Sequence, residues 1–213
     1  MVADPGFGHV FVVRGDVLAM AGDVLVVPTD ASGWVEAPWR AHLAGLGVGF
    51  EAQGDGPGRL AVQERERIGG RVAVEADGGR QVWLLASGVS PADRAASMSE
   101  LLTGQDRQAL SGVLERFAVR LLATRSDPDG RLVASGARPC PLVVVPLLGS
   151  GQGGFGSRLR SHAAWLLGQL HRLAVDARVD VVLVVHGAER RASAYEALLR
   201  QERSRIGLIP DVA

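Results

Sequence analysis

The sequence contains no lysine and no asparagine, so all 23 of its basic residues are arginine. The absence of lysine excludes a P-loop lysine, a Schiff base and a lysine general base. The absence of asparagine excludes any mechanism that positions water or a ribose with an Asn carboxamide. General acid–base chemistry can therefore come only from carboxylates and histidines.

Cysteine and excess charge are also scarce. There is only one cysteine, Cys140, so an intrachain disulfide is impossible. Its place between two prolines before an apolar run indicates a buried thiol rather than a nucleophile.

A formal net charge of zero gives no basic excess, so we expect no nucleic-acid partner. No apolar run approaches the ~20 residues of a membrane helix. The first nine residues do not resemble a signal peptide, so we expect a cytoplasmic protein without a membrane partner.

The 213 residues, 47% of them hydrophobic, suffice for one well-packed core, and we expect a single domain over residues 1–213. Continuous runs of Val and Leu are typical of strands covered on both faces. Strands are predicted at 10–13, 24–27, 59–63, 71–74, 81–85, 142–146 and 179–185, with 59–63 and 71–74 forming a hairpin in a region of about 47–80. Helices are predicted at 36–46, 107–124, 157–175 and 192–203. This alternation predicts an α/β fold, a three-layer α/β/α sandwich around a mixed, mostly parallel sheet of about six strands, with 24–27, 143–146 and 181–185 central.

The strongest functional signal follows the strand at 142–146, where Leu147-Leu148-Gly149-Ser150-Gly151-Gln152-Gly153-Gly154-Phe155 leads into a helix. Glycines let several backbone N–H groups approach one anion, and a helix N-terminus adds partial positive charge. The pattern predicts a phosphate-binding loop, and a tight turn without a ligand is the alternative. Gly149, Gly151 and Gly154 match G-x-G-x-x-G, but the late position and the lack of an acidic residue ending the next strand disfavour an NAD dehydrogenase.

Two earlier segments complete a pattern that resembles the macro domain over residues 10–200: Val12-Val13-Arg14-Gly15-Asp16-Val17 and Asp23-Val24-Leu25-Val26-Val27-Pro28-Thr29-Asp30. The resemblance implies ADP-ribose or a related NAD-derived nucleotide as the ligand. It assigns the adenine amine to Asp16, the diphosphate to Gly149–Gly154, the distal ribose to Phe155 and the border of the adenine to His186. The implied ligand-binding residues are Gly15, Asp16, Val17, Thr29, Asp30, Gly149, Ser150, Gly151, Gln152, Gly153, Gly154, Phe155 and His186. Without the resemblance, Asp16 is equally well a turn-forming residue, and His186 a strand-end histidine without a ligand.

We therefore expect a binding module for such a nucleotide, connected to a fused or partner effector, with no resident cofactor and no metal. The alternative is an ADP-ribosyl hydrolase in which Asp30 or Glu36 activates water, and a scaffold with a degenerate loop is the third reading. Trp34 and Trp39 are candidates for pocket walls, although helix packing explains Trp39 equally well. Because asparagine and lysine are missing, little or no hydrolysis of ADP-ribosylated protein is expected.

Overall fold

The computed structural model describes residues 8–52, 55–76, 79–88, 104–126, 132–136, 138–148, 159–186, 193–198, 200 and 201. The strands are β1 (Val10–Arg14), β2 (Val24–Asp30), β3 (Trp34–Val35), β4 (Gly58–Arg59), β5 (Arg71–Val74), β6 (Gln81–Gly88), β7 (Leu142–Pro146) and β8 (Asp180–Val185). The helices are α1 (Ala37–Gly45), α2 (Val62–Arg65), α4 (Gly104–Ser126) and α5 (Leu159–Ala177). Residues 193–198, 200 and 201 are also helical, as expected for 192–203.

Six strands form one sheet in the order β1-β8-β7-β2-β6-β5. Every neighbouring pair is parallel except the antiparallel pair of β5 and β6. The runs at 24–27, 143–146 and 181–185 all lie inside the sheet, which explains why they are continuously apolar. The predicted α/β fold with a mixed, mostly parallel sheet of six strands is confirmed.

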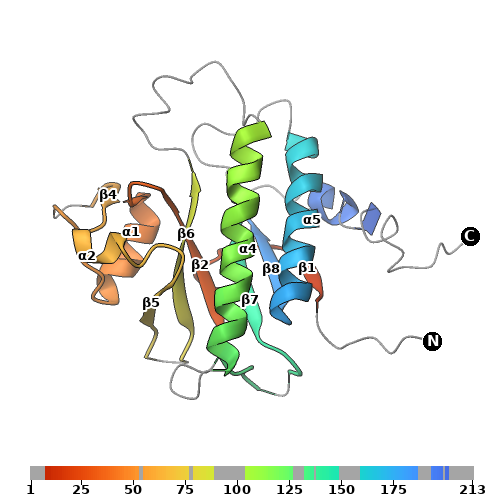
Figure 1. The fold of residues 1–213 in the computed structure, drawn as a ribbon, viewed down its shortest axis with the longest axis horizontal. Helices are drawn as coiled ribbons and strands as arrows, with labels where there is room; N and C mark the ends of the chain where they lie inside the picture. Colours follow the sequence, from red (N-terminus) through yellow and green to blue (C-terminus); the bar gives the residue numbers. More distant parts are fainter. Residues whose placement is uncertain are drawn as a thin grey trace, which may run out of the picture.

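Helices α4 and α5 lie side by side over one face of this sheet (Figure 1). Their apolar stripes are buried against alternate residues of the strands, and Phe117 of α4 and Leu170 of α5 belong to the same buried cluster as Val24 and Val26 of β2. Phe117 also meets Trp83 of β6 edge-on, with ring centroids 5.5 Å apart. Each such side chain contributes roughly 1.5–3 kcal/mol through burial, so this layer supplies much of the core.

The opposite face carries helix α1 and the segment that crosses from β1 to β2. Leu43 of α1 is fully buried against the side chains of β2 that point to this side, Leu25 and Val27. Val17 and Met20 of the crossing segment pack on the same cluster. The two covered faces confirm the expected three layers.

The predicted hairpin of 59–63 with 71–74 is wrong. Only Gly58–Arg59 is extended, and it pairs with β3, whereas Val62–Arg65 forms helix α2. The side chains Gln, Glu and Arg favour a helix after Ala61. Strand β5 pairs instead with the long central strand β6, because β6 offers a buried and apolar edge.

Among the residues described, no helix is both long and apolar enough to cross a membrane. The helices bury only one of their sides. In α4, for example, Leu114 and Leu121 are buried whereas Val119 is exposed. Such a one-sided apolar stripe suits packing against the sheet.

Candidate functional site

The sheet has a topological switch point between β2 and β7. After β2 the chain continues through β3, α1, β4, α2 and β5 to β6 on one side, whereas after β7 it continues through α5 to β8 on the other side. The connections of two adjacent parallel strands therefore leave in opposite directions at their carboxyl ends. In open α/β sheets, ligands bind in the crevice at such a point.

The carboxyl ends of β1, β8, β7, β2 and β6 share one edge of the sheet, at the top of Figure 1. We refer to it as the carboxyl edge. Four of the sequence-derived segments come together there: Gly15–Val17, Thr29–Asp30, Leu147–Leu148 and His186, each directly at or after a strand end. Gly149–Phe155, the predicted phosphate loop, lie outside the described residues.

At the end of β2, Asp30 organises the following loop. One carboxylate oxygen, Oδ1, accepts hydrogen bonds from Ser32 N (2.9 Å), Ser32 Oγ (2.8 Å) and Trp34 N (2.8 Å). The other oxygen, Oδ2, is buried and has no hydrogen-bond partner among the residues described. Asp30 is only 3% exposed. Because an unpartnered buried acceptor is costly, Oδ2 is suited to receive a donor from outside the chain.

The loop after β2 is fixed from both sides. Thr29 Oγ1 donates to the carbonyl of Trp34 (3.0 Å), so Thr29 supports the loop and does not present its hydroxyl outward. Gly33 has φ +82°, and a Cβ there would lie 2.6 Å from Cγ of Arg65. A glycine is therefore required where α2 packs against the loop. The fixed backbone holds the Asp30 carboxylate in one place.

At the ends of β1 and β8, the backbone N–H of Gly15 donates to the carbonyl of Val185 (3.3 Å). This bond places Asp16 two residues beyond the end of β1 and His186 one residue beyond the end of β8, and both are exposed. Asp16 Oδ1 accepts from Leu18 N (3.0 Å), so the residue forms the turn and still presents its carboxylate to solvent. Val17 packs toward the sheet and contributes only backbone to this edge.

His162 of α5, which sequence reasoning did not identify, contacts the backbone just after the end of β7. Nε2 of His162 lies 3.2 Å from the carbonyl oxygen of Leu148, and the imidazole is fully buried. Burial first, and then the charge of nearby Arg107, lower the pKa of His162 to about 4 against the opposing effect of the hydrogen bond to Leu148. Its position four residues before Leu166, on the apolar stripe of the helix, is the signal that could have identified it.

The remaining candidates near β2 differ in accessibility. Glu36 is the N-cap residue of α1, half-buried, and its side chain makes no capping hydrogen bond. Trp34 keeps 38% of its surface exposed beside Asp30. Trp39 belongs to α1 and packs against the core, as helix packing predicts. Trp34 is thus the aromatic side chain available to a ligand at this end of the edge.

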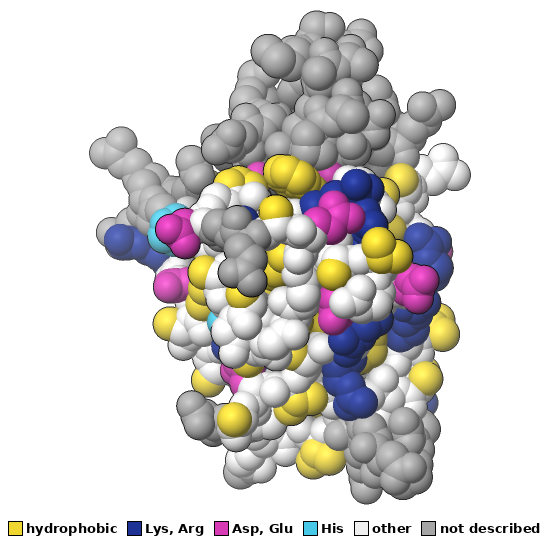
Figure 2. Space-filling model, turned by 90° about the vertical axis from the view of Figure 1, so that its left-hand side faces the viewer, with side chains coloured by type: hydrophobic (Ala, Val, Ile, Leu, Met, Phe, Trp, Pro, Cys, Tyr) yellow, Lys and Arg dark blue, Asp and Glu magenta, His cyan; other side chains and the backbone are white. Residues whose placement is uncertain are grey.

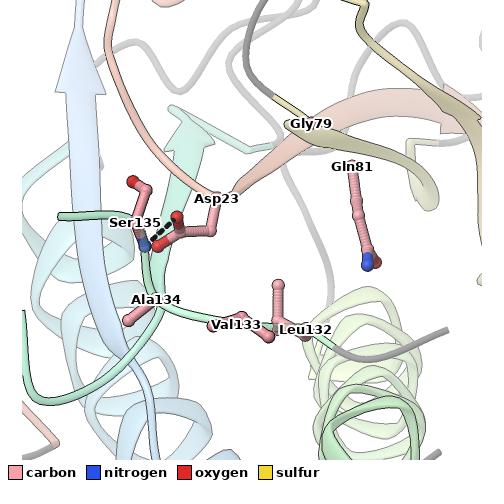
Figure 3. Close-up of a pocket in the computed structure, with 7 residues that line it drawn as sticks. All are labelled: Asp23, Gly79, Gln81, Leu132, Val133, Ala134 and Ser135. Carbon is pink, nitrogen blue, oxygen red and sulfur yellow. Dashed lines mark hydrogen bonds between the residues drawn. The ribbon is translucent and has the colours of Figure 1, made fainter. Parts of the chain in front are cut away.

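A hollow of roughly 290 Å³ lies at the opposite edge, lined by Asp23, Gly79, Gln81, Leu132, Val133, Ala134 and Ser135 (Figure 3). The carboxylate of Asp23 is already occupied by the backbone N–H groups of Ser135 (2.8 Å) and Leu142 (2.7 Å) and by Arg138 (2.8 Å). We therefore interpret Asp23 as a clamp that joins the loop before β7 to β2, and the hollow as part of that joint.

The face formed by α1, α2, β4 and β5 shows Arg and acidic side chains beside one another (Figure 2). Arg65 and Arg59 both pair with Glu51, at 2.8 and 3.8 Å, and Arg67 pairs with Glu64 at 2.9 Å. The two partly exposed pairs of Glu51 contribute little to stability, whereas Glu64 is a largely buried partner. They do neutralise the face, which fits the zero net charge of the chain.

Metal chemistry and thiol chemistry have no support in the part of the chain that the structure describes. No group of three or more His, Cys, Asp or Glu residues there could hold a metal ion. Cys140 is buried, as predicted, and burial together with a hydrogen bond to Asp180 raises the pKa of its thiol to about 11. The thiol is therefore protonated at neutral pH and unsuited to act as a nucleophile.

No protein-family model and no curated protein matches the sequence. Function must therefore be argued from the residues at the carboxyl edge.

Proposed function

We propose that this chain is a macro-domain-like module that binds ADP-ribose or a related NAD-derived nucleotide at the carboxyl edge. One observation carries the proposal. The glycine-rich segment 149–154 follows the strand on one side of the switch point, and Asp30 ends the strand on the other side. A glycine-rich segment after one strand and a buried acceptor at the end of the other suit a ligand that combines phosphate with hydroxyl groups.

The two sides of the switch point favour different chemical groups. Glycine N–H groups after β7 are donors and suit a diphosphate. The Oδ2 atom of Asp30 is an acceptor that repels phosphate and accepts a hydrogen bond from a hydroxyl or amine. A ribose hydroxyl beside a diphosphate meets both requirements.

The exposed carboxylate of Asp16 lies farther along the edge, at the end of β1. From β2 to β1 the sheet crosses three strand spacings, about 14 Å in total. A ligand that contacts both ends must therefore be extended, which favours a diphosphate-linked nucleotide over a single nucleoside. An acceptor at Asp16 suits an exocyclic amine such as that of adenine.

Hydrolysis is the second candidate, with Asp30 or Glu36 activating water. Within the described residues, neither carboxylate forms a hydrogen bond to a histidine, and Asp30 already holds the loop through Oδ1. A general base must reach its proton at about 2.6–3.2 Å, and of the two Asp30 oxygens only Oδ2 has no partner among the described residues. The arrangement favours binding over turnover.

Calorimetry with ADP-ribose, NAD and AMP at fixed salt tests the proposal. We expect ADP-ribose to bind at least tenfold more tightly than AMP, because AMP cannot reach both ends of the edge. An absence of heat with every nucleotide, or equal affinity for AMP and ADP-ribose, would contradict it. Robust turnover of an ADP-ribosylated peptide that disappears in Asp30→Ala would establish the hydrolase instead.

A further inference from the structure

The carboxylate of Asp30 is buried without a positive charge paired to it. The three groups that donate to its Oδ1 atom are neutral: the backbone N–H groups of Ser32 and Trp34 and the Ser32 hydroxyl. Oδ2 has no hydrogen-bond partner, and no salt bridge among the described residues includes Asp30. Buried charges in proteins are normally paired with an opposite charge. Oδ2 therefore suits a positively charged group from outside the chain.

Two arginines contact the loop that follows Asp30, and both are engaged by other groups. Arg59 donates through Nε to the carbonyl of Ser32 (3.1 Å), and its guanidinium lies 3.8 Å from Glu51. Arg65 packs against the loop, but its guanidinium pairs with Glu51 at 2.8 Å. Glu51 thus balances the positive charges beside the loop, whereas the charge of Asp30 is left without a counterion.

An indole ring and a second carboxylate lie close to Asp30 along the chain. Trp34 and Glu36 are two positions apart in extended backbone, with Glu36 at φ −67° and ψ 154°, so their side chains leave the chain on the same side. Val35 points to the other side and is fully buried in the core. The Trp34 side chain is exposed, and Glu36 makes no capping hydrogen bond. Indole faces and carboxylates both attract cations.

We propose that the end of β2 binds a planar organic cation with N–H donors. Oδ2 of Asp30 accepts from an N–H group of this cation, while the Trp34 ring and the Glu36 carboxylate lie beside its charge. A neutral ribose hydroxyl also supplies a donor, but it leaves the carboxylate charge unbalanced.

The inference deepens the proposed function, on which the nucleotide part of the ligand rests, because it makes the group at the far end of that ligand cationic. Two NAD-derived ligands carry such a group. One is the pyridinium carboxamide of oxidised NAD, and the other is a guanidinium joined to ADP-ribose. Both cations are flat and carry N–H donors, so the experiment must distinguish them.

A metal ion is the competing occupant for a buried carboxylate. Mg²⁺ and Ca²⁺ need several oxygen ligands, of which Oδ2 of Asp30 supplies one. In the part of the chain that the structure describes, no group of three or more His, Cys, Asp or Glu residues could hold a metal ion. An exposed aromatic ring close to the carboxylate favours an organic cation.

Small cations alone provide a test that does not depend on nucleotide binding. The full chain is titrated with 1-methylnicotinamide, with methylguanidinium and with neutral nicotinamide, and the indole N–H signals of its four tryptophans are followed by NMR. Trp34→Phe assigns the Trp34 signal. We expect this signal to shift saturably with at least one cation, and nicotinamide to bind about tenfold more weakly, as for one lost charge-assisted interaction. The tighter cation identifies the source of the group.

Three variants separate the site from a general effect of charge. Asp30→Asn keeps an acceptor for Ser32 and Trp34 but removes the charge, so we expect about tenfold weaker binding of the cation. Glu36→Gln should weaken it about threefold, and it keeps the test decisive if the loop opens in Asp30→Asn. Glu66→Gln removes a charge from the exposed end of α2 and should bind the cation as wild type does.

The absence of a saturable shift with both cations would overturn the inference, as would equal affinity for nicotinamide. Undiminished affinity in both Asp30→Asn and Glu36→Gln would also overturn it. A Trp34 shift with Mg²⁺ or Ca²⁺ that Asp30→Asn removes would assign the site to a metal instead.

Calorimetry then extends the test to the nucleotide. The ligand that carries the tighter cation, NAD⁺ or ADP-ribosylated arginine, should bind about tenfold more tightly than NADH or ADP-ribose, which lack the charge. If no nucleotide binds, the proposed function fails, whereas the small cations still decide this inference. If ADP-ribose binds and neither small cation does, the inference fails and the proposed function stands.

Discussion

The carboxylate of Asp30 accepts a hydrogen bond from the backbone N–H of Trp34 at 2.8 Å, which closes the loop at the end of β2. The same oxygen also holds Ser32, so one atom sets the conformation of the loop and the other remains unpartnered among the described residues. In the proposed function, loop structure and ligand recognition are thus divided between the two oxygens of one side chain. Because of this division, mutations of Asp30 can separate the two roles.

Asp30→Asn and Asp30→Ala should therefore differ. The asparagine variant can keep an oxygen toward Ser32 and Trp34 but replaces Oδ2 with a donor, so we expect a small change in urea stability and roughly tenfold weaker ADP-ribose binding. The alanine variant also loses the loop hydrogen bonds and should lose about 1–3 kcal/mol of stability. Urea unfolding and calorimetry measure the two effects. Unchanged affinity in Asp30→Asn would exclude Oδ2 from the site.

Gly151→Glu adds bulk and negative charge to the predicted phosphate loop. If two charge-assisted hydrogen bonds to the diphosphate are lost, at roughly 1.5–3 kcal/mol each, binding should weaken at least about a hundredfold. The melting temperature serves as the folding control. A variant that folds normally and binds ADP-ribose as tightly as wild type would show that the phosphate site lies elsewhere.

Asp16→Ala should have a smaller and more selective effect. The exposed carboxylate can lose at most one hydrogen bond to the base, so we expect about tenfold weaker binding of ADP-ribose. The preference for adenine over other bases should fall as well. Competition between ADP-ribose and an analogue with a base that lacks the exocyclic amine measures this, and an undiminished preference would assign the base to other residues.

Gly33→Ala should destabilise the protein more than Gly47→Ala. Both glycines have positive φ, +82° and +81°, so the backbone strain of about 1 kcal/mol is shared. Only at Gly33 would the new Cβ also meet Arg65, at 2.6 Å, whereas Gly47 has no atom within 4 Å. We expect an additional loss of about 1–2 kcal/mol for Gly33→Ala in urea unfolding. Equal losses would mean that Arg65 moves aside freely.

The buried imidazole of His162 predicts an acid-sensitive fold. Its pKa is about 4 in the folded protein against an ordinary value of 6.5, so between these pH values the unfolded chain binds more protons. Stability should be complete above pH 6.5 and should fall by up to about 1.4 kcal/mol per pH unit as the pH drops toward 4. His162→Gln should remove this part of the slope. An identical pH dependence in wild type and variant would refute the assignment.

The sequence determined the strands and helices whose local pattern is unambiguous. Continuous Val and Leu runs predict the interior strands β2, β7 and β8, and one-sided apolar stripes predict α4 and α5, because burial on two faces or on one leaves a direct mark on composition. The turn at Gly15-Asp16 is likewise local. In each case the neighbours along the chain contain the information.

Only the tertiary structure decided which segments meet. The run at 59–63 pairs with nothing at 71–74, because β6 is the better partner for β5 and the residues after Ala61 are helical. The packing of Arg65 of α2 against Gly33, in the loop that the Asp30 carboxylate holds, is likewise a contact between distant residues. His162 finds its hydrogen-bond partner at Leu148, 14 positions away. Strand order, the switch point between β2 and β7 and the buried imidazole depend on contacts between distant residues, and such contacts leave no periodic pattern in the sequence.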